Sequence, residues 1–204
     1  KSASNDPNKP ATNNFLSKYK LNSINLIEIS LLILILSIAI ILRVLPLRWG
    51  AYLNEYDPFF WYRSAEYIVK NGFSAWFNWH DALAWYPYGK TVSTTSFPGN
   101  PFSAAILYYA LNTLGLNVTL LDVCLYFPIL MAVLTCIVAY FFGKELGGKP
   151  VGILTAFLMA INPAYLERTG LGFFDTENIG IFGMIATGLF LLKALKKDNS
   201  LRSI

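Results

Sequence analysis

The chain has 204 residues, of which 55% are hydrophobic and only 14% are charged. Soluble domains carry about 25% charged residues, so this composition excludes an ordinary soluble domain and indicates a membrane protein. The net charge of +4 is small, and the basic residues gather at loops and ends, which argues against a nucleic-acid-binding face.

The chain opens with a polar segment at residues 1–22, which predicts a tail before a first transmembrane span at 23–46. The core of that span, residues 29–42, is uncharged and apolar apart from two serines. With its apolar flanks it approaches the roughly 20 residues that a helix needs to cross a bilayer. No small-residue cleavage site follows, so the segment is interpreted as a span and not as a signal peptide.

Residues 47–121 form the first predicted external loop, which is dense in aromatic side chains between 49 and 88. Tryptophan and tyrosine favour the boundary between membrane and water, so we expect short helices lying along the membrane surface. Residues 97–121 are uncharged and long enough for an additional span. Proline and glycine at positions 98–101 make a continuous crossing unfavourable, and we predict an interfacial element there as well.

Three further spans are predicted, at residues 122–142, 151–163 and 179–195. Both cysteines, Cys124 and Cys136, fall in the first of these and are interpreted as small buried apolar side chains. The remaining segments are a tight turn at 143–150, a second external loop at 164–178 and a polar end at 196–204.

Basic residues predict how these spans are oriented. Lysines and one arginine gather in the tail, in the turn at 143–150 and after the last span, and four crossings put these segments on one side. The positive-inside rule makes that side cytoplasmic and both long loops external. The residues concerned are Lys1, Lys9, Lys18, Lys20, Lys144, Lys149, Lys193, Lys196, Lys197 and Arg202.

Three acidic residues stand close to span ends on the predicted external side. Asp57 lies in NEYDPFFWYR of the first loop, and Asp175 and Glu177 lie in GFFDTEN of the second. Helix capping is one explanation for the aspartates, because Asp is a preferred N-cap and Pro58 suits a first helical turn. Three carboxylates near a low-dielectric boundary also repel one another unless a cation compensates them. We therefore predict a hard divalent cation, Mg²⁺ or Mn²⁺, held by Asp57, Asp175 and Glu177.

Two arginines are candidate substrate-binding residues. Arg63 has the chemistry to contact a lipid phosphate, although it also lies three residues before Glu66 on one predicted helix. Arg168, beside the second acidic motif, either contacts a carrier phosphate or balances its neighbour Glu167.

Four segments in order resemble the catalytic subunit of oligosaccharyltransferase, the enzyme of asparagine-linked glycosylation. They are NEYDPFFWYRSAEYIVKNG, WYPYGK at 85–90, SFPGNP at 96–101 and GFFDTEN, and the resemblance runs from about residue 29 to 195. It implies an all-α, polytopic glycosyltransferase fold of the GT-C type. It also implies an aspartate in the first external loop, matched by Asp57, and a D-x-D motif in the second, matched by Asp175 and Glu177 with Glu in place of the commoner Asp.

The resemblance further implies a metal-dependent transfer of an oligosaccharide from a polyprenyl (dolichyl) phosphate or pyrophosphate carrier to Asn in Asn-X-Ser/Thr. The expected partners are that lipid-linked oligosaccharide, the acceptor protein or peptide and membrane lipids. The expected site lies on the external face of the cell membrane, or the lumenal face of the endoplasmic reticulum. We expect the chain to come from a single-subunit enzyme of an archaeon. The later spans and the Trp-Trp-Asp-Tyr-Gly motif of the family do not occur, so we expect an N-terminal portion that is inactive alone.

Three other functions compete with this one. A protein O-mannosyltransferase of the same fold would use an adjacent acidic pair in the first loop, whereas Asp57 is followed by Pro58. A transporter would place acids within its spans, and a non-catalytic scaffold would use the loop acids only as helix caps.

Overall fold

The computed structural model describes residues 23–202, so the predicted tail at 1–22 and residues 203–204 lie outside it. The described part is almost entirely helical, and the prediction of an all-α polytopic fold is confirmed. One short antiparallel pair of strands was not predicted. In chain order the elements are α2 (Ser23–Val44), η1 (Leu45–Trp49), α3 (Asp57–Asn71), η2 (Phe73–Asn78), β1 (His80–Asp81), β2 (Lys90–Thr91), α4 (Val92–Thr95), α5 (Gly99–Thr113), α6 (Leu120–Ile161), α7 (Pro163–Glu167) and α8 (Glu177–Arg202).

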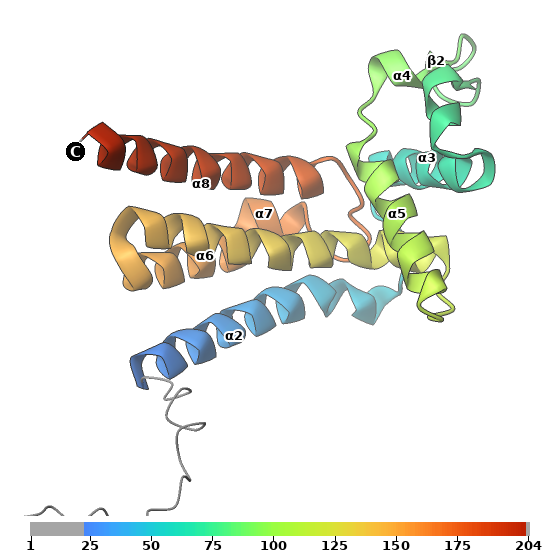
Figure 1. The fold of residues 1–204 in the computed structure, drawn as a ribbon. Coiled ribbons are helices and arrows are strands. Elements are labelled where there is room, and N and C mark those ends of the chain that lie inside the picture. The colour runs from blue at the N-terminus through green and yellow to red at the C-terminus, as the bar shows by residue number, and fades with distance from the viewer. Residues whose placement is uncertain (1–22, 203–204) are drawn as a thin grey trace, which may run out of the picture.

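Three stretches of the described chain are long and apolar enough to cross a membrane, namely Asn25–Trp49, Leu120–Ile161 and Glu177–Lys197. The second of them is α6, which doubles back on itself (Figure 1). Its backbone leaves the helical conformation at Gly147 and Gly148, where Gly148 has a φ of +80° that side chains rarely adopt. The predicted spans at 122–142 and 151–163 therefore fall in the two arms of a single helical hairpin.

Small residues let the two arms of α6 approach closely. A Cβ added at Gly152 would lie 2.7 Å from the carbonyl oxygen of Tyr140, and one at Gly143 would overlap the Thr155 hydroxyl. Without a hydrophobic driving force inside a bilayer, such close backbone packing is a main source of helix association. Helix α2 packs on this hairpin through a buried cluster that includes Ile35 and Ala39.

The first long loop folds into a compact cap at one end of the helices (Figure 1). Helices α3 and α5 pack together, and α5 runs across the direction of α2, α6 and α8. At 15 residues α5 is about 22 Å long, too short for the roughly 30 Å of a hydrocarbon core. It is thus not one of the span-length elements of the described chain, which agrees with the interfacial role predicted for residues 97–121.

Aromatic packing holds the cap together. Trp76 is 1% exposed, and Tyr67 stacks on Trp79 with ring centroids 4.2 Å apart. An ion pair between Arg63 of α3 and the buried Asp81 fixes the β1–β2 ribbon to the helix. Some of the aromatic residues that suggested a membrane-surface loop, Trp61, Trp76 and Trp79 among them, therefore also build its core. Others, such as Tyr56 and Tyr86, are exposed.

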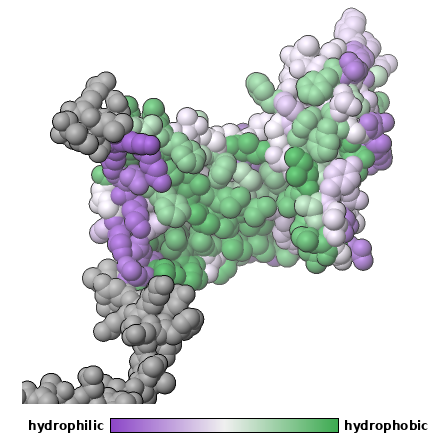
Figure 2. All heavy atoms as spheres, in the orientation of Figure 1, coloured by the Kyte–Doolittle hydropathy of each residue, from purple (hydrophilic) through white to green (hydrophobic). Residues whose placement is uncertain are grey.

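Polar and apolar surfaces separate along the helices. Figure 2 shows a broad hydrophobic band over the middle of the molecule, with a hydrophilic cluster at the end away from the cap. The turn of α6 and the last part of α8 lie at that end (Figure 1) and carry the lysines at 144, 149, 193, 196 and 197. Glu28 of α2 pairs there with Lys144 at 3.0 Å and Lys149 at 2.5 Å, which ties α2 to the hairpin.

Arg43, near the end of α2, is fully buried. Its guanidinium donates to the Ala39 and Ala160 carbonyl oxygens at 3.1 and 3.0 Å and to the Thr169 hydroxyl at 2.8 Å. No carboxylate pairs with it within residues 23–202. Ala160 lies in the last turn of α6, where carbonyl groups lack helical partners and attract cations. Arg43 therefore joins α2, the end of α6 and the early part of the second loop, at Thr169.

We expect Arg43→Met to lower the free energy of unfolding by about 1.5–3 kcal/mol, because charged-group hydrogen bonds of this size are lost. Thermal unfolding of the purified protein in detergent measures the effect. Arg48→Met is the matched control, since Arg48 is exposed on the adjoining η1 helix. Equal destabilisation by the two substitutions would contradict the role assigned to Arg43.

Candidate functional site

The second loop, residues 164–178, is held in place by hydrogen bonds from its own backbone. The Gly172 N–H donates to the Leu125 carbonyl of α6 at 3.0 Å, and the Gly172 carbonyl accepts from the Asn54 N–H of the first loop at 3.0 Å. One residue earlier, the Leu171 N–H donates to the Arg43 carbonyl at 2.9 Å. Three segments distant in sequence thus meet on this loop.

Gly172 is the residue that makes this meeting possible. Its φ of +80° is strained for any residue with a side chain. A Cβ at this position would also overlap the carbonyl oxygen of Tyr52 and lie 3.3 Å from the Cα of Leu53. The close approach of the first and second loops therefore requires glycine, and it occurs three residues before Asp175.

Asn178 fixes the turn that presents the acids. Its buried side-chain amide donates to the carbonyl oxygens of Phe173 and Asp175, both at 2.8 Å. Phe174, which is fully buried, packs edge-on against Phe127 of α6 with ring centroids 5.5 Å apart. The turn is thus anchored by the apolar packing of Phe174 and by the two hydrogen bonds of the Asn178 amide.

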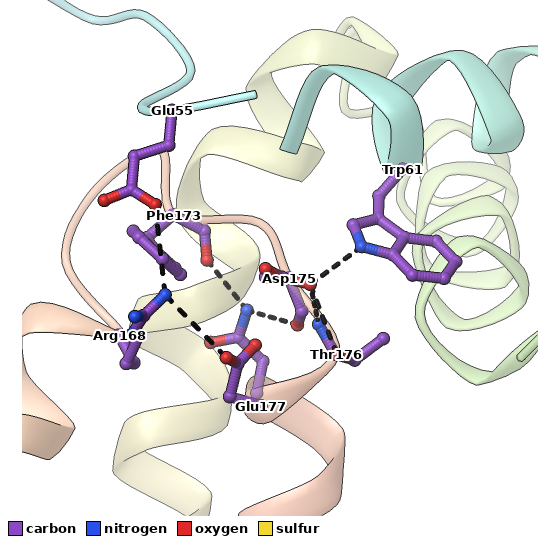
Figure 3. A network of polar contacts seen from close by, with 8 residues as sticks. Glu55, Trp61, Arg168, Phe173, Asp175, Thr176 and Glu177 are labelled. Carbon is purple, nitrogen blue, oxygen red and sulfur yellow. Dashed lines mark hydrogen bonds and ion pairs between the residues drawn. The ribbon is translucent and has the colours of Figure 1, made fainter. Parts of the chain in front are cut away.

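Asp175 is oriented by three donors from two residues, and all of them use the same carboxylate oxygen. The Trp61 indole N–H donates to Oδ1 at 2.7 Å, and Thr176 donates to it through its backbone N–H at 2.6 Å and its hydroxyl at 3.2 Å (Figure 3). The residue is 7% exposed. Because Oδ1 is satisfied by the protein, Oδ2 is the oxygen left for another ligand.

Asp57 is the first residue of α3, and the helix is not capped by its side chain. The N-cap is Tyr56, which forms no side-chain capping bond, and Pro58 occupies the first turn. Asp57 is exposed. The capping explanation for this acid is therefore wrong, and its carboxylate remains available.

One cavity of about 290 Å³ brings the three acids together. Asp57 reaches it from α3, and Asp175 and Glu177 reach it from the second loop. Its other lining residues are Phe60, Trp61, Lys90, Thr95, Ser96, Phe97 and Thr176. A larger pocket of about 570 Å³ adjoins it and shares Asp57, Phe60 and Lys90 with it.

The donor chemistry of this cavity fits a divalent cation. Its carboxylate oxygens are the ligands that Mg²⁺ and Mn²⁺ prefer. One of them, Oε2 of Glu177, is buried and has no hydrogen-bond partner among the described residues, and such an atom is costly unless it is paired. Within residues 23–202, however, no three His, Cys, Asp or Glu side chains are gathered closely enough to form a complete metal site. The predicted set of Asp57, Asp175 and Glu177 shares a cavity but does not yet surround a common point.

Neither predicted arginine lines the cavity of the three acids. Arg168 lies 3.9 Å from Glu55 and 3.9 Å from Glu177, so its acidic neighbours are these two and not Glu167 (Figure 3). Its positive charge partly offsets the charge of Glu177 from a position outside the cavity.

Arg63 forms its ion pair with Asp81, and not with Glu66, which pairs with Lys70 at 2.9 Å. The Arg63 side chain lines the adjoining larger pocket. The predicted phosphate contacts of Arg63 and Arg168 stay predictions.

Comparison with known proteins identifies the family. Residues 24–204 match the family model for the N-terminal part of the oligosaccharyl transferase STT3. The chain belongs to the STT3 family. It is 37% identical over 175 residues to subunit STT3B of the dolichyl-diphosphooligosaccharide–protein glycosyltransferase of Arabidopsis thaliana, covering 85% of this chain and 24% of that protein. It is 36% identical over 177 residues to subunit STT3 from Dictyostelium discoideum, covering 84% and 25%.

Solved structures agree with the STT3 assignment. The oligosaccharyltransferase of Archaeoglobus fulgidus in its apo form superposes with a TM-score of 0.68 at 26% identity, covering 86% of this chain and 20% of that chain. The archaeal oligosaccharyltransferase AglB from the same organism, in complex with an inhibitory peptide and a dolichol-phosphate, gives a TM-score of 0.67 at 27% identity, covering 87% of this chain and 20% of that chain. The chain spans about a quarter of the length of the curated relatives it matches. Its resemblance to this family is confirmed, and it is a multi-pass membrane protein.

Three residues of this STT3 chain were not predicted as part of the site, namely Trp61, Lys90 and Asn178. Trp61 follows Asp57 by four residues, so both lie on one face of α3, and this spacing was visible in the sequence. Nothing in the sequence indicated the partners of Asn178 or the placement of Lys90, because these depend on the fold.

We expect Trp61→Phe to keep the ring packing and to lower the free energy of unfolding by about 1.5–3 kcal/mol, the range for a hydrogen bond to a charged group. The same substitution in an Asp175→Ala background should cost measurably less, because its acceptor is already absent. Denaturant unfolding of the four proteins of this cycle gives the coupling energy. A coupling of zero would mean that the indole does not orient Asp175.

Proposed function

We propose that this chain is the N-terminal membrane part of an oligosaccharyltransferase. The whole enzyme transfers an oligosaccharide from a polyprenyl phosphate or pyrophosphate carrier to the side-chain amide of Asn in Asn-X-Ser/Thr. Membership of the STT3 family favours this reaction over the O-mannosyltransferase, transporter and scaffold alternatives. The relatives from A. thaliana and D. discoideum carry a glycosyltransferase name, and AglB has been solved with a peptide and a dolichol-phosphate.

The single observation that carries the proposal is the shared cavity of Asp57, Asp175 and Glu177. It lies where the cap meets the long apolar helices, and a reaction on a lipid-borne donor needs its site at that level. The acids come from segments that are distant in sequence, as the hydrogen bond between Trp61 and Asp175, 114 residues apart, illustrates. In this proposal the cap faces the exterior of the cell, or the lumen, because the lysines lie at the opposite end.

Asp57 is assigned the role of binding and activating the side-chain amide of the acceptor asparagine. An amide nitrogen is a poor nucleophile because its lone pair is delocalised into the carbonyl group. A carboxylate that accepts hydrogen bonds from the amide N–H groups favours rotation out of conjugation and then takes up a proton. Asp57 suits this role because it is exposed, forms no cap and lines the cavity.

Asp175 and Glu177 are assigned to a divalent cation, Mg²⁺ or Mn²⁺. A cation held there by Asp175 and Glu177 would supply positive charge against the charge of the leaving phosphate. Trp61 and Thr176 fix Oδ1 of Asp175 so that Oδ2 is presented, and Glu177 supplies a buried oxygen that has no partner among the described residues. Whether the source is an archaeon, as predicted, is a separate question, since the relatives named above come from a plant, a slime mould and an archaeon.

In the full-length protein, Asp57→Ala and Asp175→Ala should each reduce transfer to a labelled Asn-X-Thr peptide by at least about a hundredfold, the usual range for loss of a positioned acid–base or charge-stabilising group. The measurement is the initial rate of glycopeptide formation. Asp122→Asn is the matched control, because Asp122 is an acid that acts only in the capping box of α6. Wild-type rates in both alanine variants would end the proposal.

Removal of divalent cations with a chelator should abolish transfer, and Mn²⁺ or Mg²⁺ should restore it. Glu177→Gln should raise the cation concentration needed for half-maximal rate by about 10-fold or more, because a charged ligand or its close partner is lost. A titration of rate against free metal distinguishes this from a general loss of activity. Full activity in metal-free buffer would exclude the cation.

A further inference from the structure

The cavity of the three acids is also lined by a basic residue and two hydroxyl-bearing residues. Lys90 is the only basic residue among its ten lining residues, and Thr95 and Ser96 follow it closely in sequence. The segment from Lys90 to Ser96 therefore brings one ammonium and two hydroxyl groups to the carboxylates. The acids come from α3 and from the second loop, so the two sets of lining residues belong to different parts of the chain.

Lys90 is held in an unusual way for a lysine. It is half-buried, and its ammonium lies 4.2 Å from the ring centroid of Phe60 and 5.0 Å from that of Trp85. Aromatic faces attract cations and orient this one. Across residues 23–202 its ammonium forms no ion pair and no side-chain hydrogen bond. Burial lowers the pKa of Lys90, while the charges of Asp57 and Asp81 act in the opposite direction.

Ser96 is an independent indication of a ligand. Its Oγ is buried and has no hydrogen-bond partner in the described part of the chain. An unpaired buried hydroxyl costs free energy, and a bound polar group is one way to remove that cost. Thr95 differs, because its hydroxyl already donates to the Thr91 carbonyl at 2.7 Å.

We propose that Lys90 and Ser96 form a binding site for the phosphate group of the polyprenyl carrier in the cavity that they share with the three carboxylates. The inference rests on the proposed function and adds two residues to it. Lys90 supplies charge-assisted donors, and Ser96 supplies a hydroxyl donor.

Electrostatics explain why such a site is needed. Asp57, Asp175 and Glu177 repel an approaching phosphate, and a single divalent cation neutralises only two of their charges. A further positive group inside the cavity reduces that repulsion. Arg63 and Arg168 do not fill this role, since Arg63 is paired with Asp81 and Arg168 stands beside Glu55 and Glu177.

The proposal is tested by equilibrium binding of a short-chain polyprenyl phosphate to the full-length protein in detergent, without turnover. Lys90→Met should raise the Kd by about tenfold or more, the equivalent of roughly 1.4 kcal/mol. Lys90→Arg should stay within about threefold of the wild type, because it keeps the charge. Lys70→Met is the matched control, since it removes the same charge from an exposed position on α3.

Ser96→Ala separates binding from structure. It should raise the Kd by about 3-fold, in the range of one neutral hydrogen bond, yet leave the thermal stability of the unliganded protein unchanged or slightly higher. A residue with a merely structural role would show the reverse, with lost stability and unchanged Kd. Unchanged Kd values in both Lys90→Met and Ser96→Ala would overturn the proposal.

Two further controls distinguish the carrier phosphate from other lipid phosphates, and failure of the site from failure of the proposed function. Phosphatidylglycerol at equal concentration should not displace the polyprenyl phosphate, and equal displacement would overturn the assignment to the carrier. If wild-type protein transfers no sugar but Lys90→Met still weakens phosphate binding, the proposed function fails and the phosphate site stands. If transfer proceeds and Lys90→Met changes neither the Kd nor the KM for the donor, the site fails alone.

Discussion

The candidate site depends on the backbone of Gly172, which is hydrogen-bonded to α6 through Leu125 and to the first long loop through Asn54. These two bonds, made by a residue with a φ of +80°, bring the second loop against the first. Backbone groups buried in a membrane protein must find partners inside the protein, so the loop cannot leave this position cheaply. The shared cavity of the three acids follows from that placement. Three residues later the chain presents Asp175, and the turn closed by Asn178 then delivers Glu177.

The site combines polar groups that have partners within the protein with polar groups that have none among the described residues. Oδ1 of Asp175 is bound by Trp61 and Thr176, and the positive charge of Arg168 stands beside Glu177. The oxygen Oε2 of Glu177 and the hydroxyl of Ser96 are buried without partners in the described chain, and the ammonium of Lys90 touches only aromatic faces. Buried polar groups are normally paired, and unpaired ones concentrate at places where a ligand completes them. The unpaired carboxylate oxygen fits a cation, and the unpaired hydroxyl and ammonium groups of the same cavity fit a phosphate.

Particular residues show where sequence reasoning succeeded and where it stopped. The paired acids of GFFDTEN and the aspartate of NEYDPFFWYR do line one cavity, although they do not gather around a common metal point. The expected partners of the arginines were wrong, because Glu66 and Glu167 were chosen for being near in sequence. Asp81, Glu55 and Glu177 are near only in space. Capping was a reasonable alternative for Asp57 until the helix was seen to begin at Asp57 itself.

The sequence by itself determined that the chain is helical and membrane-bound, because apolar runs of span length admit few other structures in a bilayer. It also determined which acids to examine, since charge is scarce in such a chain. The sequence also predicted the turn at 143–150, but only the tertiary structure decided that the backbone of α6 breaks at Gly147 and Gly148, and that Arg43 is fully buried. The tertiary structure alone placed Lys90 and Ser96 beside the carboxylates. Those outcomes depend on packing between segments tens of residues apart, whereas hydropathy and local motifs report only on neighbours along the chain.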